Sequence, residues 1–346
     1  MLLKSVVLQF ALMVADAAGL NRLFRRLNKG KTRLLMYHGV SAERSSTPYW
    51  TLLALDKFRW QMQYLKRHYD VVPATHLLDS GGEDSLSKYY PVIITFDDGL
   101  ANTYTEAWPV LRELRLCAIC FVLPSLSEAG EIVWTDRLYS CFMTAPETEL
   151  PLGEFGLEDL RVGGSDEERA RKHRELAGQL KSWPHEKRER LLAHLFDVLG
   201  HDAEAASGPF RLMSKEQIVE LGRSEEFQIG AHTCRHVILS TLSPEEQDKE
   251  IGLSLEKTNE WCDHSVPIFC YPNGQPRDFS ETTIDLLRRR GVKAALSTNG
   301  GFHDDSDDMY RIKRVPIGSD ITRAEFKARL SGLYQFLTAA AGHGYS

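Results

Sequence analysis

Short apolar runs alternate with longer amphipathic segments along most of the chain. An unbroken apolar run of about four to six residues fits a strand that is buried on both faces, as in a parallel sheet. The predicted strands are residues 34–37, 92–96, 118–123, 227–231, 267–271, 292–297 and 312–317. Residues 58–68 and 103–115 have the apolar spacing of helices. This alternation predicts an α/β fold with a mostly parallel sheet or barrel.

Capping residues mark three helix starts in the second half of the chain. In a capping box, a hydroxyl accepts a hydrogen bond from the backbone N–H three residues later, and the longer side chain there bonds back. The pairs with this spacing are Ser214 with Gln217, Ser243 with Glu246, and Thr322 with Glu325. We therefore expect helices to begin at these positions, between the predicted strands.

Residues 144–212 interrupt the α/β pattern. They are rich in Glu, Arg, Lys and Leu, with two helical stretches near 166–182 and 186–199. A solvated helical insertion explains this composition, and a lid over the substrate is the alternative. The predicted division of the chain is an N-terminal helical segment, residues 1–32, an α/β domain, residues 33–320, and a C-terminal helix and tail, residues 321–346.

The N-terminal segment predicts a basic amphipathic helix. The apolar stretch from Val6 to Ala15 contains Gln9, and apolar positions continue at helical spacing beside Arg22, Arg25 and other basic residues. Such a helix rests on a membrane surface or packs on the domain. The stretch is too short to span a membrane, and a cleaved secretion signal is the less favoured alternative.

Charge and cysteine content narrow the classes of partner. The 346 residues include 42 Lys and Arg and 48 Asp and Glu, so the formal net charge of −6 gives no reason to expect nucleic-acid binding. The closest cysteines, Cys117 and Cys120, would face opposite sides of a strand. We expect buried packing roles for them and no disulfide framework.

Candidate chemistry begins where a predicted strand ends in Asp97 and Asp98. In α/β folds, the carboxyl ends of the strands are where ligands bind. His232 and His236 follow another predicted strand, and on a helical turn both would face the same way. One carboxylate and two imidazoles suit a divalent metal, leaving a position for water and a second carboxylate to act as base.

With these residues the chain resembles the polysaccharide deacetylase family, whose shared domain is the NodB homology domain and which is similar to carbohydrate esterase family 4. The motifs that carry the resemblance are Leu35-Met36-Tyr37-His38-Gly39-Val40, Thr95-Phe96-Asp97-Asp98-Gly99, His232-Thr233-Cys234-Arg235-His236 and Phe269-Cys270-Tyr271-Pro272-Asn273-Gly274. The resemblance covers residues 33–320 apart from the insertion. It implies a distorted (β/α) barrel.

The resemblance also implies which residues bind the metal and which one acts as base. Asp98, His232 and His236 would be the metal ligands, with Zn²⁺ as the expected ion, and Asp97 would be the general base. A bound ion of this kind lowers the pKa of its water and polarises an amide carbonyl. Asp97 would take the proton of that water as it attacks the N-acetyl carbon.

Substrate contacts follow from the third motif and from one tryptophan. By family analogy the backbone N–H of Asn273 would stabilise the oxyanion, since Pro272 has no N–H. We also expect Tyr271 of the same motif to contact the substrate. Trp134 could stack on a sugar, and packing under the insertion is the alternative.

Two features depart from the family pattern. The third motif commonly opens with an arginine that orients the base, and Cys270 stands there in this chain. Arg314, from the last predicted strand, could replace it, or could form an ordinary salt bridge. The histidine general acid expected near the last strand is missing as well. His38, at the end of the first strand, is our candidate acid, against a structural histidine as the alternative.

The sequence therefore predicts a metal-dependent hydrolase that removes N-acetyl groups from amino sugars of a polysaccharide or lipid-linked glycan. One alternative is a deformylase or small-molecule amidohydrolase of the same superfamily, and the other is an inactive glycan-binding scaffold. The resemblance implies bacterial exopolysaccharide or envelope assembly as the context. We expect a glycan partner, no nucleic acid, peripheral membrane contact through the N-terminal helix, and a location in the cytoplasm or at the inner membrane.

Overall fold

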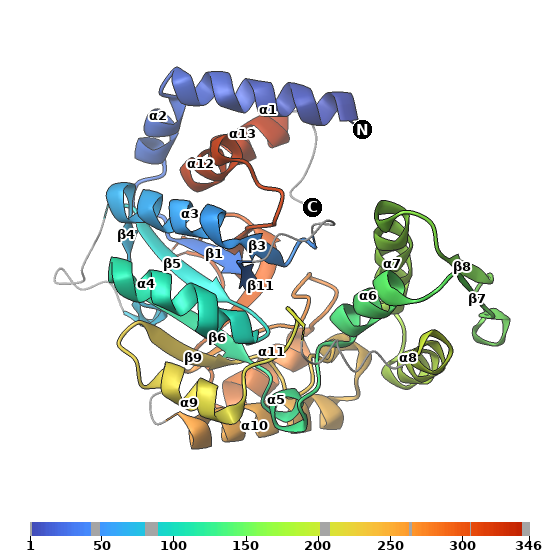
Figure 1. The fold of residues 1–346 in the computed structure, drawn as a ribbon. Helices are drawn as coiled ribbons and strands as arrows, with labels where there is room; N and C mark the ends of the chain where they lie inside the picture. The colour runs from blue at the N-terminus through green and yellow to red at the C-terminus, as the bar shows by residue number, and fades with distance from the viewer. Residues whose placement is uncertain are drawn as a thin grey trace.

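Seven parallel strands close into a barrel (Figure 1). The computed structural model describes residues 2–42, 49–79, 89–200, 208–262, 265–304 and 306–340. The strands follow the order β1, β12, β11, β10, β9, β6, β5, and β5 pairs back to β1. Their bounds are β1 (Arg33–Tyr37), β5 (Pro91–Phe96), β6 (Ala118–Val122), β9 (Phe227–Ala231), β10 (Ile268–Cys270), β11 (Ala294–Gly300) and β12 (Ile312–Pro316). The predicted distorted (β/α) barrel is confirmed.

Alternation along each strand divides the core into an inner and an outer layer. Leu34 of β1 pairs in register with Ile93 of β5, and both pack inside the barrel with Ile312 of β12. The next pair, Leu35 and Ile94, packs in a separate cluster with the covering helices. Because side chains alternate with a period of two, both faces of each strand are buried and the strands are continuously apolar.

Helices cover the outside of the barrel, and shorter elements complete its connections. The helices beside the strands are α3 (Leu55–His68), α4 (Trp108–Leu114), α5 (Pro124–Ala129), α9 (Lys215–Gly222), α10 (Pro244–Trp261) and α11 (Glu281–Arg289). The short strands are β2 (Gly39–Ser41), β3 (Leu52–Ala54) and β4 (Asp70–Val71), and the short helical turns are η1 (Ala74–Leu78) and η4 (Leu239–Thr241). The helix expected over 103–115 begins as a π-helical turn, η2 (Thr103–Ala107), before α4.

The capping residues behave as the sequence predicts at two of three sites. Ser214 and Ser243 form complete capping boxes at α9 and α10. Thr322 caps α12 (Arg323–Ser331) by accepting from the Glu325 N–H, but the Glu325 carboxylate does not bond back. Instead it accepts hydrogen bonds from Gln9 and Arg329.

The insertion forms a lobe beside the barrel, seen at the right of Figure 1. Its elements are α6 (Trp134–Thr144), β7 (Thr148–Leu150), η3 (Gly153–Phe155), β8 (Leu160–Val162), α7 (Asp166–Leu180) and α8 (His185–Leu199). Leu138 and Phe142 of α6 share a buried cluster with Leu180, Leu191 and Leu195. Because α6 belongs to this cluster, the helical part of the lobe begins at Trp134, before the residues that the composition marks out.

The N-terminal helices pack on the C-terminal ones at the top of Figure 1. Leu12 of α1 (Leu2–Ala17) packs with Ala324 and Ala328 of α12 and with α13 (Leu333–Ala340). An 84° bend separates α1 from α2 (Leu20–Leu27). Within the described residues, no single helix is long and apolar enough to cross a membrane, although α1 and α2 together meet that test as a bent pair. The expected tail at the C-terminus lies mostly outside the described residues.

Candidate active site

The candidate residues meet at the carboxyl ends of neighbouring strands. Tyr37 of β1 pairs with Phe96 of β5, so His38 and Asp97 are the next residues of two adjacent strands. His232 follows Ala231, the last residue of β9, and Ala231 pairs with Phe269 of β10. The parallel barrel therefore brings together motifs that are far apart in the sequence, at the end of the barrel where such folds bind their substrates.

Asp98, His232 and His236 form a compact group with the ligand types of a metal site. Oδ1 of Asp98 lies 3.4 Å from Nε2 of His232 and 3.3 Å from Nε2 of His236. One ligand atom from each residue lies within 4.8 Å of the other two. Asp98 and His232 are buried, and the His236 side chain is 12% exposed, so solvent reaches the group from one side.

The two histidines do not share a helical turn, as the four-residue spacing suggested. Residues 232–236 form a loop, in which Thr233 and His236 have φ values of 66° and 55°. These left-handed residues turn the chain back within four positions, so both Nε2 atoms still face Asp98. The expectation of a helical turn is therefore wrong, and the loop turns provide the same convergence.

Unfavourable backbone conformations concentrate at this site. Five non-glycine residues of the described chain have positive φ, and four of them are Asp98, Thr233, His236 and Asn273. Left-handed conformations cost a non-glycine residue about 1 kcal/mol or more, and such strain persists where the surrounding structure imposes it. The barrel rim therefore holds these four residues in place at a cost in stability.

The residues present fit a divalent metal. Oδ1 of Asp98 is buried and has no hydrogen-bond partner in the described part of the chain, which leaves a carboxylate oxygen free to bind a cation. Nδ1–H of His232 donates to the Cys270 carbonyl at 2.7 Å, which leaves Nε2 as the nitrogen that faces Asp98 and would bind a cation. Burial lowers the pKa of His236 to about 4, so this imidazole is neutral at pH 7 and able to bind a metal.

A second group, Asp97, His232 and Cys270, also has ligand atoms close together. It is less suited to a metal because both Asp97 oxygens already accept hydrogen bonds from Arg314. Burial also raises the pKa of the Cys270 thiol, which disfavours the thiolate that a metal requires. The Asp98 group is therefore the better metal site.

Arg314 holds Asp97 by a bidentate pair inside the barrel. Nη1 and Nη2 each lie 2.8 Å from one oxygen of the Asp97 carboxylate, and the guanidinium is fully buried. Nε donates to the Ser297 carbonyl at 2.8 Å, and Nη1 also contacts Thr95 at 3.2 Å. Burial alone would raise the pKa of Asp97, but the Arg314 charge and hydrogen bonds outweigh it and lower that pKa.

Cys270 contacts the same carboxylate, at the oxygen that also accepts from Nη1 of Arg314. Its sulfur is 3.5 Å from Oδ1 of Asp97, in the position where the resemblance leads one to expect an arginine. Ile268 and Ile312 pack inside the barrel. Cys270 and Arg314 come two residues later on the same strands, so their side chains also point inward. The arginine that contacts the base therefore comes from β12, and a small thiol leaves room for it.

His38 lies at the same rim, within electrostatic range of both carboxylates. Burial lowers its pKa, and the charges of Asp98 and Asp97 oppose that shift. Its ring packs edge-on against Trp50 at 4.8 Å between centroids. Nδ1 is buried and has no hydrogen-bond partner within the described ranges. The neutral ring therefore has one nitrogen uncommitted near the site.

The predicted substrate residues are placed differently from one another. Asn273 has a φ of 60°, and its N–H makes no hydrogen bond within the part of the chain that the structure describes. Tyr271 has no free donor, because its hydroxyl donates to the Tyr310 carbonyl at 3.0 Å and its N–H donates to Leu296. Trp134 is half-buried in the lobe, where Arg188 packs over its ring.

Two further polar groups near the site were not among the predicted site residues. Asp136 is buried, accepts a hydrogen bond from the Tyr49 hydroxyl at 3.0 Å, and has its pKa raised to about 8 by burial and by Asp98. Lys181 ends the first long helix of the lobe and faces the barrel rim. Nothing in the sequence distinguishes Lys181 from the other basic residues of the insertion.

Known proteins resemble this chain over part of its sequence and most of its fold. The family model for polysaccharide deacetylases matches residues 187–295. The predicted resemblance to this family is confirmed. The Bacillus subtilis protein named "Putative polysaccharide deacetylase YxkH" is 23% identical over 121 residues, a match that spans 35% of this chain and 42% of that relative.

Solved structures extend the likeness to most of the chain. The Streptococcus pyogenes deacetylase PplD superposes with a TM-score of 0.58 at 16% identity, covering 87% of this chain and 98% of that one. IcaB from Ammonifex degensii gives a TM-score of 0.54 at 17% identity, covering 88% and 97%. At these identities the likeness establishes a shared fold.

Proposed function

We propose that this chain is a metal-dependent carbohydrate N-deacetylase. The observation that carries the proposal is one ionised carboxylate, Asp97, held by a buried arginine beside a separate Asp98-His232-His236 group. A binding protein needs no base next to its metal, whereas hydrolysis of an amide by a metal-activated water uses both. Among proteins of the same fold, PplD is described in complex with acetate, which is the product expected here.

In the proposed mechanism Asp98, His232 and His236 hold the divalent ion, for which Zn²⁺ is the expected identity. When bound, the ion supplies Lewis-acid chemistry and makes a nearby water more acidic. Asp97 accepts a proton from the attacking water, and Arg314 keeps the carboxylate ionised and correctly turned. Each Asp97 oxygen accepts one hydrogen bond from Arg314, so each keeps a second lone pair that can take the proton of the water.

The remaining steps are proposed for Asn273 and His38. The N–H of Asn273 donates a hydrogen bond to the oxyanion that forms at the acetyl carbon. His38 is proposed to assist departure of the amine. Its pKa is lowered, so the imidazole is neutral at pH 7 and can donate a hydrogen bond through its N–H. The proton that the leaving amine receives is then the one that Asp97 took from the water.

The test separates metal binding from catalysis in the full-length protein. Asp98→Ala should lose both bound metal and activity, whereas Asp97→Asn should keep the metal and lose about 100- to 10,000-fold in turnover. Metal content is measured by mass spectrometry and acetate release by an enzymatic assay on N-acetylglucosamine oligomers. Release of formate or ammonia would instead identify a deformylase or another amidohydrolase. Stoichiometric metal without any product would support a glycan-binding scaffold.

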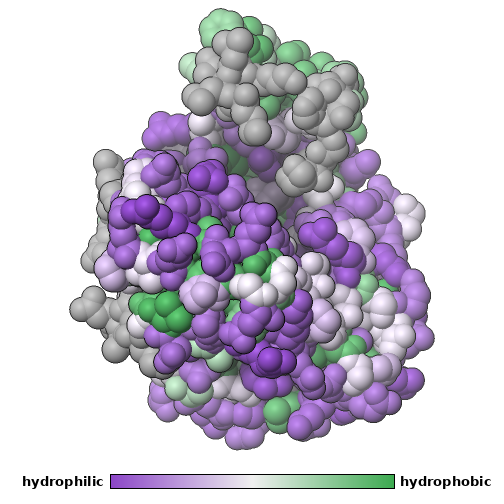
Figure 2. Space-filling model, turned by 90° about the vertical axis from the view of Figure 1, so that its right-hand side faces the viewer, coloured by the Kyte–Doolittle hydropathy of each residue, from purple (hydrophilic) through white to green (hydrophobic). Residues whose placement is uncertain are grey.

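We also propose that the N-terminal helices rest on a membrane surface, which would locate the protein at the inner membrane. The outer face of α1 exposes Val7, Phe10 and Met13 at 61%, 69% and 62%. Leu23 and Leu27 of α2 are exposed beside Arg22 and its basic neighbours. Figure 2 shows hydrophobic surface at the top of the molecule, the end where α1 lies in Figure 1. Exposed apolar side chains beside basic ones suit an anionic bilayer.

A further inference from the structure

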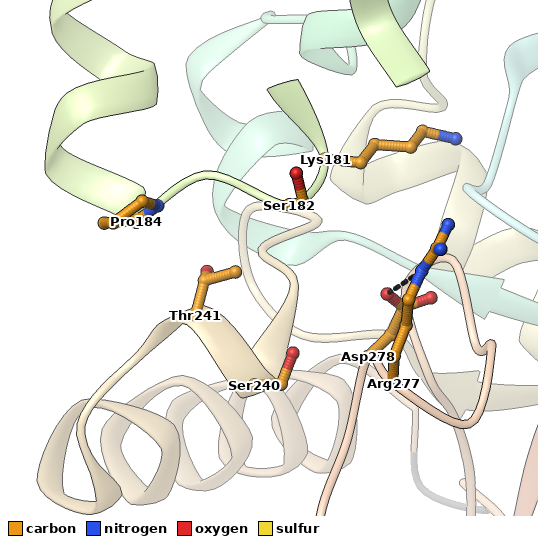
Figure 3. Close-up of a pocket in the computed structure, with 7 residues that line it drawn as sticks. All are labelled: Lys181, Ser182, Pro184, Ser240, Thr241, Arg277 and Asp278. Atoms are coloured by element: carbon orange, nitrogen blue, oxygen red, sulfur yellow. Dashed lines mark ion pairs between the residues drawn. The ribbon is translucent and has the colours of Figure 1, made fainter. Parts of the chain in front are cut away.

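A cavity lies between the lobe and the rim of the barrel (Figure 3). Its volume is about 380 Å³, within the size range of small-molecule sites. The lobe contributes the end of α7 and the turn before α8, and the barrel contributes two rim loops. The lining residues are Lys181, Ser182, Pro184, Ser240, Thr241, Arg277 and Asp278.

Two cationic side chains point into the same part of this cavity. In Figure 3 Lys181 extends from the end of α7 in the lobe and Arg277 rises from a barrel loop below it, with both charged ends on the right of the view. Within the described ranges, the Lys181 ammonium has no carboxylate within the 4.0 Å of an ion pair and no hydrogen bond. Such an uncommitted ammonium is available to a ligand.

The acidic residue of the lining is already committed to its own loop. Oδ2 of Asp278 accepts the Gln275 N–H at 2.8 Å, and Oδ1 faces Nε of Arg277 at 4.0 Å. Two positive charges against one negative charge leave the charged lining with a net charge of +1. The charge left over is that of Lys181, so the cavity favours an anion.

The hydroxyl groups of the lining are arranged to accept hydrogen bonds. Ser182 donates its hydroxyl proton to the Gln179 carbonyl at 2.8 Å, and Thr241 donates to Ile238 at 2.7 Å. Their oxygens keep lone pairs for a donor such as a sugar hydroxyl. Anion-binding groups and hydroxyl acceptors together match an acidic sugar better than a bare inorganic anion.

Lys181 also connects the cavity electrostatically with the candidate metal site. Burial lowers the pKa of Lys181, and the carboxylates of Asp278, Asp136 and Asp98 oppose this shift. The two rim loops of the lining also continue the chain from the candidate site, since Ser240 lies four residues after His236 and Arg277 lies four residues after Asn273. Because these loops join the cavity to the candidate site, a ligand in the cavity can belong to the same extended glycan as the acetamido sugar.

We propose that this cavity is a subsite for an acidic sugar of the glycan substrate, one that carries a carboxylate or a phosphate, bound beside the acetamido sugar that is hydrolysed. The inference rests on the proposed deacetylase function and adds to it a preference for anionic glycans. Lys181 and Arg277 bind the acidic group, and the Ser182 and Thr241 oxygens accept hydrogen bonds from sugar hydroxyls. A partly desolvated ammonium binds an anion more strongly than an exposed one does.

The kinetic test uses matched substrates and variants of the full chain. N-acetylglucosamine oligomers are compared with the same oligomers carrying a neighbouring glucuronate or a 6-phosphate. Lys181→Met and Arg277→Met should each raise KM for the acidic oligomers about tenfold and leave kcat/KM for the neutral oligomer within about twofold. Arg190→Met, an exposed arginine of α8 outside the lining, should change neither.

A binding test separates this inference from the proposed function. Calorimetry with free glucuronate, glucose 6-phosphate and glucose needs no turnover, so it gives an answer even if no substrate is hydrolysed. Binding of either acidic sugar but not of glucose, weakened about tenfold by Lys181→Met, supports the subsite. The acidic sugar that binds more tightly shows whether the subsite prefers a carboxylate or a phosphate. Equal binding of all three sugars, no binding, or an unchanged affinity in Lys181→Met would overturn it.

Discussion

At the scale of single residues, the pairing of Arg314 with Asp97 explains how the base works without the arginine of the usual motif. Both Nη atoms bond the carboxylate at 2.8 Å, and Arg314 itself is fully buried. A lysine would keep the charge but could not form two parallel hydrogen bonds. The geometry of Asp97 therefore depends on the planar guanidinium and not on positive charge alone.

We expect Arg314→Lys to lower kcat about 10- to 100-fold, because the base loses its fixed orientation. Arg314 lowers the pKa of Asp97, so its replacement should raise that pKa. The acidic limb of the kcat/KM profile, where Asp97 becomes protonated, should then move to higher pH. The measurement is a pH–rate profile of both proteins.

Arg33 provides the matched control for this substitution. It is another fully buried arginine, but its guanidinium bonds backbone carbonyls of Leu330 and Asn28 instead of a carboxylate. Arg33→Lys should lower stability without moving the acidic limb. An identical shift in both variants would mean that the effect is general and that Arg314 does not position the base.

At the scale of elements, the lobe contains a buried histidine that makes its stability depend on pH. His173 of α7 donates from Nε2 to the Thr135 carbonyl at 3.0 Å, while its Nδ1 is buried. Burial lowers the pKa of His173 to about 4, from an ordinary value of 6.5. The folded lobe therefore requires this imidazole to be neutral.

We expect this requirement to lower the free energy of unfolding as the pH falls from 6.5 to 4. In that range the unfolded chain binds a proton at His173 that the folded chain does not, so stability is full above pH 6.5 and falls as the pH approaches 4. The loss from this group is at most about 3.5 kcal/mol, since each pKa unit corresponds to about 1.4 kcal/mol. Urea unfolding followed by tryptophan fluorescence measures it.

His173→Gln keeps an N–H donor but does not titrate, so its stability should be flatter over the same pH range. His194→Gln is the control, since His194 lies on the surface of the same lobe and bonds the Pro151 carbonyl. If His173→Gln kept the full pH dependence of the wild type, another group would be responsible.

At the scale of the whole molecule, the proposed membrane face lies on the N-terminal helices, and the lobe and the barrel mouth lie lower in Figure 1. Phe10→Ser with Met13→Ser should reduce binding to vesicles containing about 30% anionic lipid by about tenfold or more, because two apolar side chains that would insert into the bilayer are lost. Acetate release from soluble oligomers should stay near the wild-type rate. Vesicle co-sedimentation measures the binding.

Leu253→Ser is the control, because Leu253 is an exposed apolar residue of α10 outside the N-terminal helices. Its vesicle binding should equal that of the wild type. Wild-type protein that stays in the supernatant with anionic vesicles would contradict the membrane proposal and leave the deacetylase proposal standing.

The sequence by itself determined the barrel and the position of its chemistry. Apolar strands without polar alternation require cover on both faces, and repeated strands and helices supply it as a parallel barrel. Asp97, Asp98 and His232 directly follow such strands, so their place at one rim follows from local sequence alone. Local patterns sufficed here because burial and strand direction are properties of contiguous residues.

Only the tertiary structure decided the contacts between distant segments. Arg314 reaches Asp97 because β12, β1 and β5 are neighbours in the closed barrel. The Glu325 carboxylate accepts a hydrogen bond from Gln9 and does not complete the capping box, because α1 packs on α12. The turns at Thr233 and His236, and the approach of Lys181 to the rim, depend on packing in the same way. Periodicity records which face of an element is buried, but not which side chain it will meet there.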